Sequence, residues 1–210
     1  MTKISVLLNQ WRKTPRGPTP KIEEEEIAAA LKTIEESPMG RYQLSKRLRL
    51  PEGTIRGLLD RLNQKHWIEV SKTGCSLTEE GRKTLEEYLK ENGIIRLTTL
   101  NKSKIKNLAP GEEIITILIR RSEEEPNGIK QRDEAIRIGA KGATTLLVED
   151  GTIKFPKTRE SITKYYPQED AYLREILKPK NRQIIILCWA DEKSIAIKGA
   201  IKAAKTLTQK

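Results

Sequence analysis

The chain has 210 residues, of which 36% are hydrophobic and 33% are charged, and its formal net charge is +11. This composition is too apolar for a disordered polymer, and the two cysteines and single histidine do not form a disulfide framework or a spacing typical of zinc ligands. The longest apolar run, Ile184–Ala190, is too short to cross a membrane, so we expect a reduced, cytoplasmic protein with no membrane partner, metal or cofactor.

Residues 1–20 are expected to form a flexible basic arm. The stretch "WRKTPRGPTPK", residues 11–21, holds three prolines and four basic residues, which favours an extended chain. Such an arm either frays as a leader or reaches along the backbone of a nucleic acid.

Residues 21–92 are expected to form a first domain with the element order helix, helix, turn, helix, hairpin, helix. Pro51 separates the second helix from the third, and the lysine-tipped turn "KTG" separates two short strands that follow. This order is the layout of a winged helix-turn-helix, in which the third helix enters the major groove of DNA.

The helix after Pro51 is amphipathic and locally basic. Four apolar residues recur at helical spacing and are expected to face inward: Ile55, Leu58, Leu59 and Leu62. Gly53, Gly57, Asp60 and Gln64 then face outward, and the two glycines either permit close approach to DNA or are tolerated because they lie near the helix start. The segment from Arg41 to Lys72 contains eight basic and three acidic residues, and this local positive charge suits a polyanionic partner.

Within this domain, Arg56 has the side chain that best pairs with a guanine edge, and Gln64 suits adenine. Arg41, Arg61 and Lys65 are better placed for phosphates. Lys72, at the hairpin tip, would contact the DNA backbone or the minor groove. The candidate DNA-binding residues are Arg41, Gly53, Thr54, Arg56, Gly57, Arg61, Gln64, Lys65 and Lys72.

Residues 93–210 are expected to form an α/β domain with one sheet, helices on one of its faces, and hence two layers. Asp150–Gly151 lies between two strand-like runs and predicts a hairpin. We expect this domain either to form a homodimer or to bind a small-molecule effector, for which Lys154, Lys157 and Arg159 are candidate lining residues.

Neither domain offers a recognisable catalytic set. "GAKGATT", residues 139–145, has a Gly-x-x-Gly spacing, but it connects a helix to a strand, whereas phosphate loops connect a strand to a helix. The chain has one histidine and no Ser/His/Asp or Cys/His pattern, so we expect no enzyme activity.

Three stretches, "GRYQLSKRLRLPEGTIRGLLDRL", "RDEAIRIGAKGATTLLVEDGTIKFP" and "CWADEKSIAIKGAIKAA", resemble an uncharacterised archaeal family. The resemblance implies an N-terminal winged helix paired with a C-terminal α/β domain of unknown function. It also implies that the second domain has a two-layer fold of the GAD/DCoH type, similar to the insert (GAD) domain of bacterial aspartyl-tRNA synthetases. It supplies no catalytic residue.

These features predict a DNA-binding transcriptional regulator that contacts double-stranded DNA through a winged helix and uses its second domain for assembly or effector binding. The alternative is a winged-helix interaction module in RNA or translation machinery. The charge distribution favours that alternative, because residues 93–210 carry 23 basic and 15 acidic side chains, a net of +8, against +3 for residues 1–92.

Overall fold

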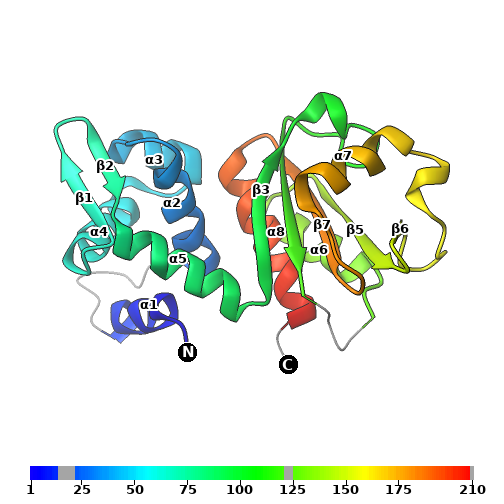
Figure 1. The fold of residues 1–210 in the computed structure, drawn as a ribbon. Coiled ribbons are helices and arrows are strands. Elements are labelled where there is room, and N and C mark those ends of the chain that lie inside the picture. Colours follow the sequence, from blue (N-terminus) through cyan, green and yellow to red (C-terminus); the bar gives the residue numbers. More distant parts are fainter. Residues whose placement is uncertain (14–21, 121–124, 209–210) are drawn as a thin grey trace. The chain divides into compact units, whose positions relative to one another are not determined.

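The computed structural model describes residues 1–13, 22–120 and 125–208. The chain divides into two compact units, Met1–Glu91 and Asn92–Lys210. The first is helical with one hairpin, and the second is built on an antiparallel sheet (Figure 1). The mixed α+β class expected from the sequence is confirmed.

The N-terminal unit follows the expected order of elements, with one additional helix at its start. Its elements are α1 (Lys3–Lys13), α2 (Glu24–Glu36), α3 (Arg41–Leu48), α4 (Glu52–Gln64), β1 (Ile68–Ser71), β2 (Gly74–Leu77) and α5 (Glu79–Glu91). Arg49 takes a left-handed conformation that ends α3, and Pro51 precedes α4. The helices predicted on either side of Pro51, and the hairpin after them, are therefore confirmed.

The inward face of α4 is the one that the sequence predicts. Ile55, Leu58 and Leu62 are fully buried, and Leu59 is 8% exposed. α4 packs against α3 and β1, whose residues Leu44, Leu48 and Ile68 are also buried. Burying this stripe fixes the rotation of α4 and therefore decides which of its residues face solvent.

The expectation of a flexible arm over residues 1–20 is wrong for Lys3–Lys13, which form α1. Ile4, Leu7, Leu8 and Trp11 are buried at the spacing i, i+3, i+4 and i+7, and α1 packs against α2 and α5. This apolar stripe outweighs the basic character of the segment because its burial stabilises the helix. The rest of the expected arm, residues 14–20, lies outside the described residues.

The C-terminal unit holds a five-stranded sheet with the order β3-β4-β7-β5-β6, in which all neighbouring strands are antiparallel. Its strands are β3 (Ile94–Leu100), β4 (Glu113–Ile119), β5 (Gly142–Glu149), β6 (Thr152–Lys154) and β7 (Ile184–Ala190). Its helices are α6 (Ile129–Arg137), α7 (Pro167–Leu177) and α8 (Lys193–Thr208), with short 3₁₀ turns η1 (Lys102–Lys104) and η2 (Ile162–Lys164).

Helices cover both faces of this sheet, so the expected two-layer arrangement is wrong (Figure 1). Leu187 of β7 packs with Leu173 and Leu177 of α7. The next residue, Cys188, faces the other side and lies against Gly199 of α8. Successive strand residues point to opposite faces, and β7 is apolar on both, which requires a cover on each side.

The predicted hairpin at Asp150–Gly151 is confirmed. Glu149 pairs with Thr152 across a two-residue turn, and both turn residues have positive φ, 49° and 70°. This is the backbone that matches the twist of the flanking strands. Among the described residues, no helix combines the length and the apolar character needed to cross a bilayer.

Candidate nucleic-acid interface

A hollow of about 460 Å³ lies between the outward face of α4, the start of α3 and the β1–β2 hairpin. Three cations from these three elements line it: Arg56 from α4, Arg41 from α3 and Lys72 from the hairpin. Leu59 and Val70 contribute apolar surface. The hollow therefore brings together positive charges that are up to 31 positions apart in the sequence.

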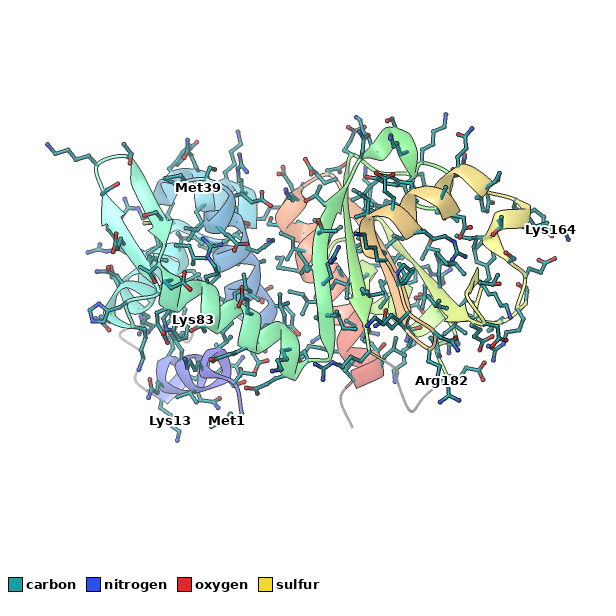
Figure 2. The ribbon with its side chains drawn as sticks, viewed as in Figure 1. Met1, Lys13, Met39, Lys83, Lys164 and Arg182 are labelled. Atoms are coloured by element: carbon teal, nitrogen blue, oxygen red, sulfur yellow. The ribbon has the colours of Figure 1, made fainter. Side chains whose placement is uncertain are left out.

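The hairpin is fixed beside α3 by a short backbone bridge. Met39 exchanges two hydrogen bonds with Cys75, of 3.0 and 2.9 Å, and lies just before α3 (Figure 2). Gly74 has φ of +125°, and a Cβ there would lie 2.6 Å from the carbonyl carbon of Met39. Only glycine permits this close approach, which places Lys72 at the tip of the two-residue loop as predicted.

The charges of the hollow are only partly neutralised. Nε of Arg41 lies 3.8 Å from Oε2 of Glu52, and the carboxylate of Asp60 on α4 also lines the hollow. Within the described part of the chain, no ion pair involves Arg56 or Lys72, and both are exposed. These two cations are therefore the ones best able to receive an external anion.

The two glycines on the outward side of α4 have different surroundings. No atom lies within 4 Å of the position that a Cβ of Gly53 would occupy, so an approaching ligand has access there. At Gly57 the corresponding position lies 3.1 Å from Cζ2 of Trp11. The interpretation of Gly57 as a glycine left open for DNA is therefore wrong, because α1 of the same chain fills the space.

Arg61 takes part in the same contact with α1. Its guanidinium carbon lies 4.4 Å from the centroid of the Trp11 ring, and its Nη1 donates a hydrogen bond of 2.9 Å to the Gly57 carbonyl. A cation over an indole face is attracted to the ring quadrupole. Arg61 thus has a structural partner that the sequence did not indicate.

The remaining candidates lie outside the hollow. Thr54 is half-buried near the start of α4, and Gln64 and Lys65 are exposed at its end. The structure adds Gln43 and Asn63 to the lining. Asn63 follows Arg56 by seven positions, two helical turns, so helical periodicity alone could have identified it.

The candidate effector residues of the C-terminal unit are largely occupied by neighbouring carboxylates. Lys154 lies 3.6 Å from Glu149, and Arg159 forms ion pairs with Glu149 and Glu125. Lys157 is exposed. No group of three potential metal-ligating side chains comes together among residues 1–13, 22–120 and 125–208.

Both cysteines are buried, and burial raises the pKa of each thiol, that of Cys188 to about 12. A thiol whose pKa is raised stays protonated at neutral pH, and the thiolate is the reactive form. We expect neither cysteine to react measurably with a disulfide reagent at pH 7 in the folded protein, and both to react once urea unfolds it. Rapid labelling of the folded chain, measured by absorbance and mass spectrometry, would contradict this.

Comparison with known proteins places the chain in a family. Residues 23–83 match the PH0730-like N-terminal domain, and residues 110–207 match a domain of unknown function, DUF4443. A solved structure, described as hypothetical protein PH0730 from Pyrococcus horikoshii OT3, is 30% identical and has a TM-score of 0.65. The alignment covers 86% of this chain and 91% of that one. The chain belongs to the PH0730-like family.

Both matched domains of the PH0730-like family lie within the units described above, one in each unit. The PH0730-like N-terminal domain includes α3, α4 and the hairpin, and so contains the hollow. It begins after α1, so Trp11 lies outside the matched range. No curated protein matches the chain.

Proposed function

We propose that the N-terminal unit binds double-stranded DNA as a winged helix-turn-helix and that the protein regulates transcription. In this proposal α4 enters the major groove, and the β1–β2 hairpin contacts the neighbouring backbone as the wing. The observation that carries the proposal is the convergence of Arg41, Arg56 and Lys72 on one hollow between helix and hairpin.

Local geometry supports this assignment. α3 and α4 are joined by only three residues, Arg49–Pro51, and the hairpin follows α4 directly. The bridge between Met39 and Cys75 adds a third short segment to the hairpin. The outward surface of α4 carries Arg56, while the open position at Gly53 lets a duplex approach the first turn of the helix.

The proposal predicts a salt-dependent loss of binding when the two unpaired cations of the hollow are removed. For Arg56→Ala combined with Lys72→Ala, we expect the slope of log Kd against log salt to fall by about 1.8 and the affinity at about 0.15 M salt to fall about 30-fold. On a random-sequence duplex Arg56 has no fixed guanine to pair with, so both side chains are counted as phosphate contacts. Fluorescence anisotropy with a labelled random-sequence duplex measures both quantities.

Lys83→Ala combined with Lys90→Ala is the matched control. Both lysines are exposed on α5 and line no part of the hollow, and the change in net charge is the same. Near-native binding by this variant, with weak binding by the hollow variant, supports the proposal. Equal losses in both variants would show that net charge alone attracts the duplex, and a chain that binds no duplex at any salt concentration would refute DNA binding.

We also propose that the protein acts without catalysing a reaction. Both thiols are buried and have a raised pKa, and His66, the single histidine of the sequence, is exposed outside the hollow. The rival assignment, an RNA-binding module, is tested in the same assay by replacing the duplex with a structured RNA. Tighter binding of RNA, unaffected by the changes at Arg56 and Lys72, would favour the rival.

A further inference from the structure

The C-terminal unit presents a second group of cations, on the loop that joins α7 to β7. Lys178, Lys180 and Arg182 alternate along this loop, and all three are exposed. In the part of the chain that the structure describes, none of them forms an ion pair. We call these three residues the basic loop.

Hydrogen bonds to neighbouring strands hold the basic loop in place. The Arg182 amide donates to the Val148 carbonyl at 2.7 Å, and the Asp150 amide donates to Oδ1 of Asn181 at 3.0 Å. Oε1 of Gln183 accepts a hydrogen bond of 2.7 Å from the Lys180 amide. The loop backbone is thus pinned to the β5–β6 hairpin, so its cations project from a fixed support.

Two of the three cations occupy backbone positions that do not favour them. Lys178 has φ of +47° and Arg182 has φ of +68°. A left-handed conformation is unfavourable for a residue with a Cβ by roughly 1 kcal/mol or more, and glycine avoids this penalty. At Lys178 this conformation ends α7, as the left-handed Arg49 ends α3, and it fixes the backbone from which the cation projects.

The surroundings reinforce the positive charge. Arg120 directly follows β4 and is exposed. Because the last residue of β4, Ile119, pairs with the first residue of β7, Ile184, Arg120 lies close to the end of the basic loop. Glu149 of the adjacent strand is engaged with Lys154 and Arg159. Two carboxylates lie near the loop: Asp150 is joined to Asn181 by a hydrogen bond, and Glu175 precedes Lys178 by three positions. Neither forms an ion pair with the basic loop among the described residues.

We propose that the basic loop is a second nucleic-acid contact surface, which binds backbone phosphates independently of sequence. Alternating, exposed cations on a fixed loop suit a polymer of regularly spaced anions, and each phosphate contact releases counterions. Figure 2 shows the Arg182 side chain pointing away from the sheet. This inference rests on the proposed function for the class of partner and adds a contact from the C-terminal unit.

The test is a triple variant of the full chain, Lys178→Asn, Lys180→Gln and Arg182→Asn. Asparagine is chosen at the two left-handed positions because it adopts that conformation more readily than most residues. The charge-matched control is Lys90→Gln, Lys106→Gln and Lys130→Gln, three exposed lysines away from this loop in the sequence. Anisotropy titrations across salt use a random-sequence duplex DNA and a structured RNA as separate probes.

For the basic-loop variant, we expect at least two of its three cations to contact phosphates. The salt slope should then fall by at least about 1.8, and the affinity at about 0.15 M salt at least about 30-fold, on the probe that the native chain binds. The control should change the slope by less than about half as much. Equal salt slopes for the two triple variants would refute the proposal that the basic loop contacts phosphates, and would not affect the proposal that α4 binds DNA. A native chain that binds neither probe would overturn both, and loss on RNA alone would identify RNA as the source of the phosphates.

Discussion

Replacing Trp11 with alanine is expected to lower the free energy of unfolding of the N-terminal unit by about 4 kcal/mol. Trp11 is 5% exposed, and its indole lies against Gly57 and Arg61 of α4. The change removes a large buried ring and a cation–π contact, and it leaves a cavity between α1 and α4. Urea unfolding, with hydrogen exchange of peptides from residues 1–91, measures the loss and its location.

A double-mutant cycle separates this contact from a general effect of α1. A Cβ at Gly57 would lie 3.1 Å from the indole, so Gly57→Ala gains helix propensity only by crowding Trp11. We expect Gly57→Ala to be more favourable by about 1 kcal/mol in the Trp11→Ala background than in the native chain. Additive effects of the two changes would show that α1 does not pack on α4 in solution.

Replacing Gly74 with alanine is expected to destabilise the N-terminal unit by about 3 kcal/mol and to weaken duplex binding. The residue combines a φ of +125° with a Cβ position 2.6 Å from the carbonyl carbon of Met39. Alanine must therefore push the hairpin away from the start of α3, which moves Lys72 relative to Arg56. Thermal unfolding and the anisotropy assay measure the two effects.

Gly53→Ala is the control for this change, because nothing lies within 4 Å of its Cβ position. We expect its stability to rise by up to about 1 kcal/mol, since alanine is the better helix former. Weaker duplex binding by this more stable variant would place DNA against the first turn of α4. A stability loss at Gly53 as large as that at Gly74 would show that the hairpin contact is not the cause.

The helical pattern of the N-terminal unit could be predicted because its local signals agree. The stripe from Ile55 to Leu62 and the break at Pro51 both pointed to α4 with its present rotation. The candidate site followed only in part from the same reasoning. Arg56, Arg41 and Lys72 converge, whereas Arg61 contacts Trp11, because its position on α4 faces another helix of the chain.

Two predictions were wrong although the sequence contained the pattern that contradicts each of them: the arm over residues 1–20 and the two-layer C-terminal domain. The apolar spacing of Ile4, Leu7, Leu8 and Trp11 is typical of a helix and predicts α1. The prolines and basic residues that follow favoured an extended chain, and that interpretation was applied to the whole of residues 1–20. The run Ile184–Ala190 is apolar at every position, which requires cover on both faces of β7 and excludes a two-layer domain.

The sequence by itself determined the elements of this protein and the residues that face their cores, since these depend on local conformational preferences and on the period of apolar side chains. Only the tertiary structure decided which solvent-facing cations meet. The hollow depends on a backbone bridge between Met39 and Cys75, and the basic loop depends on hydrogen bonds to Val148 and Asp150. Contacts between residues so far apart in the chain are set by packing, which no local pattern encodes.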